Sequence, residues 1–262
     1  MTEAASTRSN PDRVWTAALV IIGDEILSGR TIEANLPTLA RWLNLQGIRL
    51  MRAEVVPDDM GAIGAAVTTA LGAHDYVFTT GGIGPTHDDI TVDAIAAALR
   101  LNVVVHPDAE ARLRAHYGDR ITPARLRMAR VPEGADLIEN PETGAPGIRL
   151  GRLFILAGVP TIMQGMLAGL EGRLEGGRPV ASATLGAWCA ESAVADILAR
   201  VQNSFDGIQI GSYPLFRTDG GRLVTGANFV LRSVDDTMLA EAMASLRRAL
   251  AEAGIEAVEG EI

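Results

Sequence analysis

The chain has 262 residues, a formal net charge of −9 and a pI near 5.0, and 48% of its residues are hydrophobic. This acidic balance disfavours a broad nucleic-acid-binding surface, because proteins with such surfaces usually carry a basic face. Cys189 is the only cysteine, so an internal disulfide framework is excluded. No apolar run approaches the roughly 20 residues that cross a bilayer, and the polar start of the chain lacks the apolar segment of a signal peptide. We therefore expect a cytoplasmic protein with no membrane and no nucleic-acid partner.

Apolar strand-like segments and amphipathic helix-like segments alternate along the first part of the chain. Short apolar runs predict strands at residues 17–22, 48–56 and 75–80. One-sided apolar spacing predicts helices at residues 34–47, 60–73 and 90–100. In the first of these helices Asn35 is the expected cap and Gly47 the expected stop. This alternation predicts an α/β fold in which helices cover both faces of a parallel sheet.

A second, smaller domain is expected where glycines and charges interrupt the apolar pattern, near residues 170–180. Beyond this break the pattern predicts a strand, a helix, a strand, a helix and a short terminal strand. We expect a disordered tail over residues 1–14, a larger domain over 15–172 and a small α+β domain over 173–262. Trp42 and Trp188 are expected to pack in a core or between the domains.

Three loops carry the residues that could bind a ligand or take part in catalysis. The segments that follow the three predicted strands are "GDEILSGR" (23–30), "VPDD" (56–59) and "TTGGIGPTHDDIT" (79–91). Because ligands gather beyond the carboxyl ends of parallel strands, these loops should meet at one edge of the sheet. The glycines of the third loop let backbone amides approach a phosphate. Six acidic residues could hold a divalent cation such as Mg²⁺ beside that phosphate, namely Asp24, Glu25, Asp58, Asp59, Asp88 and Asp89.

Each of these features also has a simpler structural interpretation. Aspartates at a helix start are common caps and dipole partners, worth about 0.3–1 kcal/mol each. Glycine clusters between strand and helix are often only turn chemistry. The dinucleotide fingerprint G-x-G-x-x-G is absent, so a Rossmann cofactor site is not supported. His87 fits a solvated loop residue, and the arginine-rich stretch 112–130 fits a solvated helical face.

The three loop segments together resemble the molybdopterin-binding fold of the Mog/MoaB type, and most closely the N-terminal part of the CinA family. The likeness extends through "RMARVPEGADLIENPETGAPGI" (127–148) and "LAGVPTIMQGML" (156–167), and covers roughly residues 15–170. It implies a three-layer α/β fold built on a parallel-type sheet. The tail resembles the small α+β domain that follows in CinA-type proteins. The separate amidase domain of full-length CinA proteins is not expected here.

The resemblance implies one of two chemistries. Mog-type proteins bind molybdopterin and adenylylate its phosphate, whereas CinA-type proteins resemble metal-dependent pyrophosphatases acting on ADP-ribose or FAD. The fuller match to the CinA pattern favours the second, with a nucleotide or pterin as ligand and Mg²⁺ or a similar ion as cofactor. Family members also imply a homo-oligomer, a dimer or a trimer.

The family's motifs carry over onto particular residues. Asp58 and Asp89 are the expected catalytic pair. The expected metal ligands are Asp24, Glu25, Asp58, Asp88 and Asp89. The expected substrate-binding residues are Gly23, Ser28, Arg30, Gly81, Gly82, Gly84, Pro85 and Thr86.

The chain departs from the family pattern at three positions. Glu33 stands where an aspartate is usual, Ala157 replaces a proline and Ile162 replaces a glutamate. If that glutamate binds metal or water, the last change favours a third interpretation, a non-catalytic ligand-binding homologue.

Overall fold

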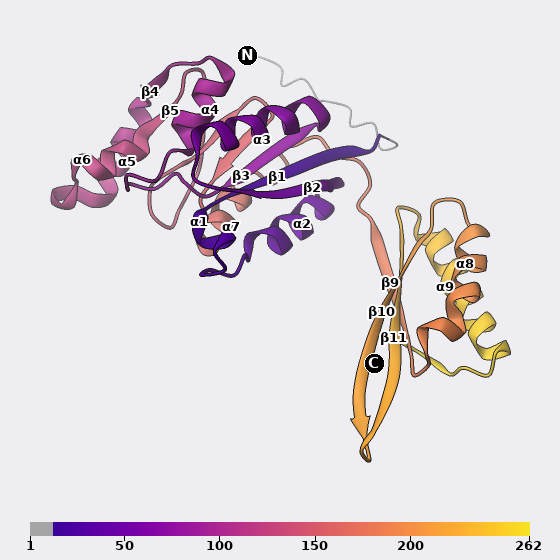
Figure 1. Cartoon of the computed structure of the whole chain (residues 1–262). Coiled ribbons are helices and arrows are strands. Elements are labelled where there is room, and N and C mark those ends of the chain that lie inside the picture. Colours follow the sequence, from indigo (N-terminus) through magenta and orange to yellow (C-terminus); the bar gives the residue numbers. More distant parts are fainter. Residues whose placement is uncertain (1–12) are drawn as a thin grey trace. The chain divides into compact units, whose positions relative to one another are not determined.

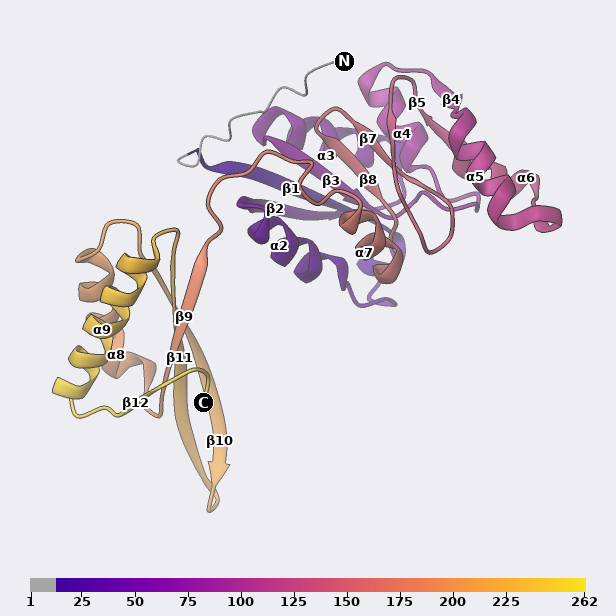
Figure 2. The ribbon, with the colours of Figure 1, turned by 180° about the vertical axis from the view of Figure 1, so that it is seen from behind.

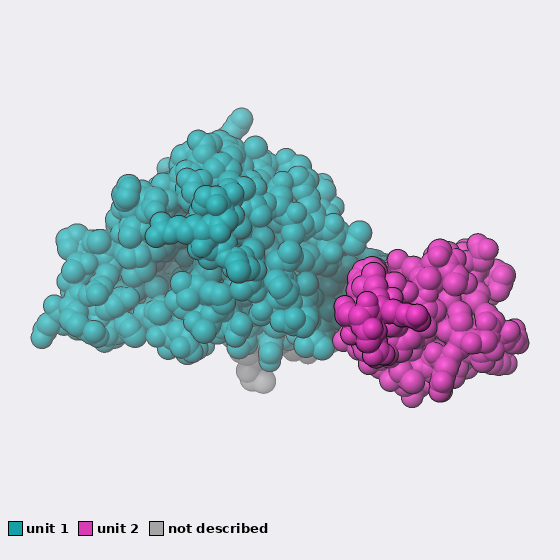
Figure 3. All heavy atoms as spheres, turned by 60° about the horizontal axis from the view of Figure 1, so that its bottom comes forward, with its two compact units in different colours: residues 1–178 teal, residues 179–262 magenta. Residues whose placement is uncertain are grey.

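The structure is a computed structural model that describes residues 13–262. It divides into two compact units, with the division between Arg178 and Pro179 (Figure 3); the boundary expected from the sequence falls slightly earlier, at 172/173. Most of the predicted disordered tail lies outside the described residues. Arg13, at the end of that tail, forms an ion pair with Asp75.

Unit 1 is built on a six-stranded sheet in the order β2-β1-β3-β8-β7-β6 (Figure 1). Its strands are β1 (Trp15–Ile22), β2 (Ile48–Val56), β3 (Tyr76–Thr80), β6 (Asp136–Ile138), β7 (Gly147–Leu150) and β8 (Leu153–Leu156). The first four strands in this order run parallel, whereas β7 and β6 each pair antiparallel with their neighbour. The expected α/β architecture is confirmed, with a sheet that is mixed at one edge.

Side chains along β1 alternate between two cores, as strand geometry requires. Leu19 and Ile21 face a core completed by α2 (Asn35–Leu45) and α7 (Pro160–Ala168). Val20 and Ile22 face the opposite core, completed by α3 (Met60–Ala73) and α4 (Thr91–Leu99). Helices therefore cover both faces of the sheet (Figures 1 and 2).

Shorter elements complete unit 1. They are α1 (Asp24–Leu27), β4 (Val103–Val105), α5 (Pro107–Tyr117), η1 (Gly118–Arg120), α6 (Pro123–Leu126), η2 (Arg127–Ala129) and β5 (Arg130–Pro132). Strands β4 and β5 pair with each other, separately from the main sheet. A small apolar cluster that includes Ala109 and Leu113 lies beneath α5.

Unit 2 packs two helices against an antiparallel sheet in the order β10-β11-β9-β12. Its elements are β9 (Ala181–Ala187), α8 (Glu191–Asn203), β10 (Gln209–Asp219), β11 (Arg222–Ser233), α9 (Asp236–Glu252) and β12 (Ala257–Glu259). Phe229, Leu231 and Leu246 are fully buried in a core separate from those of unit 1.

Three expectations at the level of single residues or elements were wrong. Strand β10 was not predicted, because its side chains are mostly exposed and it contains Pro214, a residue that disfavours strands. Trp188 is 37% exposed and lies under the Arg217 guanidinium, whereas Trp42 is buried as expected. Helix α2 is not capped by Asn35; instead the Glu33 carboxylate accepts from the backbone N–H of Asn35 at 2.7 and 2.9 Å.

Candidate functional site

The loops after β1 and β2 are joined at the carboxyl edge of the sheet. The Asp24 backbone N–H donates to Oδ2 of Asp58 at 2.9 Å, and the Gly23 N–H donates to the Val56 carbonyl at 3.2 Å. Gly23 has φ 159°, and a β-carbon added to it would lie 2.6 Å from the Glu25 carboxylate. The first two acidic segments are thus held against each other by backbone contacts.

Negative charge from all three loops gathers around Asp58. Partial burial raises the pKa of Asp58, although the hydrogen bond from the Asp24 amide opposes this; the charges of Asp24, Glu25 and Asp88 raise it further. A carboxylate whose neighbours are mostly like charges disfavours its own ionisation. Asp24, Glu25 and Asp88 thus lie close enough to Asp58 to raise its pKa, whereas hydrogen bonding by the Thr86 hydroxyl lowers the pKa of Asp88 itself. These four residues are hereafter called the acidic cluster.

The glycine loop, residues 81–86, is shaped by close backbone approach. Gly81 has φ 102°, and a β-carbon there would lie 2.1 Å from the Ile22 carbonyl oxygen. Gly82 has φ 66°, and a β-carbon there would lie 2.1 Å from the Thr91 hydroxyl. The glycines are required to seat the loop against β1 and α4.

Asp89 organises this loop. Its Oδ1 accepts from the Gly84 N–H at 2.6 Å, and its Oδ2 accepts from the Thr86 N–H at 2.8 Å and from the Thr86 hydroxyl. Other N–H groups of the loop are also engaged or missing. The Gly81 N–H donates to the Leu156 carbonyl, and Pro85 has no backbone N–H. Within residues 13–262, the N–H groups of Gly82 and Ile83 donate no hydrogen bond.

Helix capping does not explain the aspartate pair. Helix α4 begins at Thr91, and its N-cap position, Ile90, makes no side-chain cap. Asp88 is exposed, with its carboxylate 3.8 Å from Nδ1 of the solvated His87. Capping does explain Asp59, which accepts from the Ala62 N–H at 2.9 Å at the start of α3.

The remaining predicted substrate-binding residues lie at the same edge but are solvent-exposed. Ser28, Arg30, Pro85 and Thr86 are all exposed. The Ser28 hydroxyl donates to the Glu25 carbonyl at 3.3 Å, so it is partly committed to the local turn.

One basic residue beside the glycine loop was not predicted as part of the site. Arg127, in η2, lines a small cavity together with Gly82, Gly84 and Asp89. Its neighbour Arg130 is held by Asp93 in a two-point ion pair at 2.6 and 3.0 Å. Both arginines belong to the segment 127–148 whose likeness to the family was noted without a role.

The acidic cluster suits a cation only together with a ligand. Within residues 13–262, no group of three or more His, Cys, Asp or Glu side chains is placed to hold a metal ion by itself. Mg²⁺, however, usually takes only one or two protein carboxylates and fills its other positions with water and phosphate oxygens. The cluster fits that kind of shared site, with Asp58 as its most central member.

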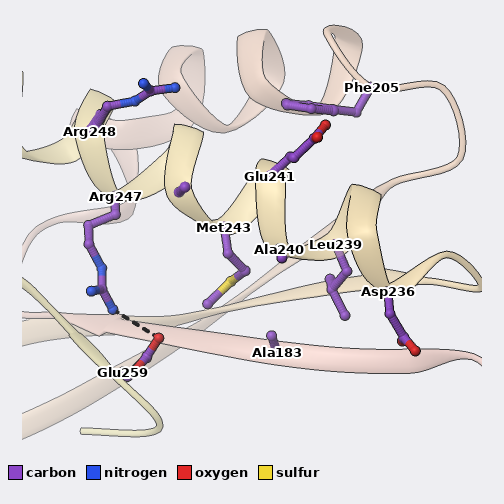
Figure 4. A pocket seen from close by; sticks show the side chains of 11 residues that line it. Ala183, Phe205, Asp236, Leu239, Ala240, Glu241, Met243, Arg247, Arg248 and Glu259 are labelled. Atoms are coloured by element: carbon purple, nitrogen blue, oxygen red, sulfur yellow. Dashed lines mark ion pairs between the residues drawn. The ribbon is translucent and has the colours of Figure 1, made fainter.

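A groove of unit 2 contains none of these residues. It runs along α9, where Leu239 and Met243 lie above Ala183 of β9, and Arg247 pairs with Glu259 at 3.2 Å (Figure 4).

None of the described helices is both long and apolar enough to span a membrane.

Comparison with known families agrees with this architecture. Residues 18–175 match the family model described as "Probable molybdopterin binding domain", so the chain belongs to that family. Residues 179–259 match the model described as "FAD synthase, middle domain". The resemblance inferred from the loop motifs is confirmed.

Individual relatives point to CinA-like proteins. The chain is 35% identical over 205 residues to Protein Ta0487 of Thermoplasma acidophilum, covering 76% of this chain and 80% of that protein. It is 38% identical over 212 residues to a CinA-like protein of Gemmatimonas aurantiaca, covering 75% of this chain but only 50% of that protein. The crystal structure of the protein CinA with unknown function from Thermoplasma acidophilum is 37% identical, with a TM-score of 0.58, and covers 61% of this chain and 98% of that chain.

Proposed function

We propose that unit 1 binds a nucleotide diphosphate such as ADP-ribose or FAD and hydrolyses its pyrophosphate bond with a divalent cation. The observation that carries this proposal is the acidic cluster, in which three loops place like charges around Asp58 beside a glycine loop. Carboxylates whose pKa is raised by burial together with neighbouring like charges are frequent at functional sites. The match of unit 2 to a FAD synthase domain supports a nucleotide as the ligand.

The residues have separate roles in this proposal. The amides of Gly82 and Ile83 and the guanidinium of Arg127 offer donors to the phosphate oxygens. Asp58, with Asp24 and Glu25, supplies negative charge for the cation. Asp89 keeps the glycine loop in its binding shape through the hydrogen bonds that it accepts from Gly84 and Thr86. When bound, a divalent cation neutralises the pyrophosphate charge and supplies an activated water.

The cation and the nucleotide should bind together. Since the described carboxylates do not form a closed metal site, Mg²⁺ alone is expected to bind weakly, and nucleotide alone is expected to meet unneutralised negative charge. Calorimetric titration of nucleotide with and without Mg²⁺ measures this coupling, and equal affinity in both conditions would count against a shared site.

Hydrolysis is tested by incubating the chain with ADP-ribose or FAD and Mg²⁺ and measuring AMP. Water attacks one phosphorus and the bridging P–O bond breaks, so ADP-ribose yields AMP and ribose 5-phosphate. Asp58→Asn should abolish the release of AMP. Asp59→Asn is the matched control, because Asp59 is the neighbouring carboxylate but serves only as a helix cap, which asparagine also provides. Activity that survives in Asp58→Asn would overturn the assignment.

A molybdopterin-binding role without hydrolysis is the second candidate. It rests on the family described for residues 18–175 and on the position of Ile162, which packs against the core of unit 1 where the family usually has a glutamate. The first turn of α7 carries no acidic residue. Binding of molybdopterin with no binding of ADP-ribose or FAD would favour this role.

A further inference from the structure

An open cavity of about 810 Å³ lies at the amino-terminal edge of the unit 1 sheet. Trp15 and Tyr76, the first residues of the parallel strands β1 and β3, form part of its wall. The glycine loop follows the last residue of β3, so this cavity and the acidic cluster lie at opposite ends of the same strands. A space of this size admits a small metabolite or a nucleotide.

One wall of the cavity is held in place by hydrogen bonds. The Tyr76 hydroxyl donates to the Glu175 carbonyl at 3.1 Å and accepts from the Glu175 N–H at 3.0 Å. The Gly177 N–H donates to the Gly47 carbonyl at 3.0 Å. The segment 174–177 is therefore fixed to β3 and to the turn after α2, and the wall is a built feature of unit 1.

Positive charge dominates the lining of this cavity. Its charged residues are four arginines and two acidic residues, namely Arg13, Arg149, Arg152, Arg173, Asp75 and Glu175. Asp75 is already engaged, because it pairs with Arg13 and accepts from the Thr16 N–H at 2.8 Å and from the Thr16 hydroxyl at 2.9 Å. The other three arginines share the cavity with a single carboxylate, in a chain whose net charge is −9. The cavity is thus a basic site in an acidic protein.

The charges of these three arginines are not neutralised by the described chain. Arg152 donates to the carbonyls of Leu71 and His74 at the end of α3, and Arg149 Nε donates to a carbonyl of its own turn at 3.1 Å. A carbonyl satisfies a donor but leaves the positive charge in place. Within residues 13–262, neither Arg149 nor Arg173 forms an ion pair. Capping of α3 explains Arg152, whereas it does not explain the other two.

The chemistry of the lining selects the kind of ligand. A guanidinium keeps its charge at physiological pH and presents a planar fork of N–H donors that matches the oxygens of an anion. A phosphate group offers three acceptor oxygens and nearly two negative charges, which suits several arginines better than one carboxylate does. The Arg13 guanidinium lies 3.7 Å over the Trp15 ring, so that face of the ring is closed to a stacking base. Recognition should therefore fall on phosphate oxygens.

We propose that this cavity binds the phosphate group of a small molecule without the help of a divalent cation. Its chemistry is the opposite of that at the acidic cluster, where phosphate is expected only together with Mg²⁺. The inference does not rest on the proposed function, because the two sites share no residue.

Two arginines of the cavity and one outside it form a matched set of variants. Arg149→Gln and Arg173→Gln each remove one positive charge and one guanidinium fork while leaving Arg152 in place. Arg112→Gln removes the same charge from an exposed position on α5 that does not line the cavity. Since Arg173 is exposed, its replacement should leave the melting temperature unchanged, so its effect on binding reports on the ligand site.

The test is calorimetric titration in EDTA at low salt, with inorganic pyrophosphate and with ADP as probes. Wild type should bind one pyrophosphate per chain. Arg149→Gln and Arg173→Gln should each weaken this binding about tenfold through the loss of charge-assisted hydrogen bonds, whereas Arg112→Gln and Asp58→Asn should leave it about the same. ADP carries the same diphosphate on a nucleoside. Tighter binding of ADP would identify a phosphate ester as the ligand, and equal or weaker binding the free anion.

The outcomes separate this site from the proposed function. Three results would each overturn the phosphate site: no binding by wild type in EDTA, unchanged binding in both cavity variants, or an equal loss in Arg112→Gln. None of them affects the hydrolysis proposal, which depends on Mg²⁺ and Asp58. Conversely, if pyrophosphate bound in EDTA and required Arg149 and Arg173 while no AMP was released from ADP-ribose or FAD, the phosphate site would stand and the hydrolysis proposal would fall.

Discussion

At the scale of single residues, neighbouring carboxylates with the same chemistry have different surroundings and therefore different roles. Asp59 caps a helix and Asp89 holds a loop, while Asp58 and Asp88 contribute to the acidic cluster. The sequence predicts that acidic residues meet at this edge, because they follow parallel strands. The sequence does not predict the role of each aspartate, because that role depends on the hydrogen bonds that the loop backbone allows.

Asp58→Asn should raise the free energy of unfolding at pH 7. The pKa of Asp58 is raised above its ordinary value of 3.8, so the stability it contributes is complete below pH 3.8 and is lost as pH rises through its folded-state pKa. The neutral asparagine avoids this loss and can still accept from the Asp24 amide. Thermal melts across pH would show a gain at neutral pH that disappears below pH 3.8. Added Mg²⁺ with ADP should stabilise wild type more than the variant; a variant that is less stable at pH 7 would contradict the prediction.

Asp89→Asn should destabilise the protein by roughly 1–2 kcal/mol, since hydrogen bonds to charged groups are worth about 1.5–3 kcal/mol and one side-chain oxygen remains. Asp88→Asn is the control, because the exposed Asp88 carboxylate contacts the Thr86 hydroxyl and its own backbone rather than the Gly84 and Thr86 N–H groups that Asp89 binds. Its effect should stay within about 0.5 kcal/mol. Denaturant unfolding measures both. Equal effects at the two positions would show that the contacts of Asp89 do not hold the loop.

At the scale of elements, the backbone of the glycine loop packs so closely against β1 that a side chain at Gly81 would not fit. Gly81→Ala forces a β-carbon to 2.1 Å from the Ile22 carbonyl, so β1 or the loop must move. Gly29→Ala is the control, because Gly29 also has a positive φ, 71°, but nothing within 4 Å of the added carbon. Gly29→Ala should cost about 1 kcal/mol from backbone strain alone, and Gly81→Ala clearly more, together with loss of nucleotide binding. Similar melting temperatures for the two variants would contradict this account.

The elements that could be predicted are those with a strong periodic pattern. Strands β1 to β3 and helices α2 to α4 lie where apolar spacing places them, within a few residues. Strands β4 and β10 carry too few buried side chains to leave a pattern. Strand β8 is fully buried, but its four residues are too few to show a period.

At the scale of the whole molecule, the chain holds two units with separate cores. The clusters around Leu19 and Val20 contain only residues of unit 1, and the cluster around Phe229 contains only residues of unit 2. Every residue proposed here to contact a ligand belongs to unit 1, whereas the FAD synthase likeness belongs to unit 2. A substitution in the core of unit 2 should therefore change the stability of that unit without changing ligand binding by unit 1.

Leu246→Ala tests this separation in the full chain. Leu246 is fully buried in the core of unit 2, so its truncation should cost about 2–5 kcal/mol there. Hydrogen exchange should accelerate in β9, β11, α8 and α9, while β1, β3 and β8 keep their protection, because domains with their own cores unfold as units. Leu223→Ala is the control, since Leu223 is 68% exposed and its truncation should change exchange little in either unit. If Leu246→Ala instead accelerated exchange equally in both units, their stability would be shared and the two cores would unfold as one.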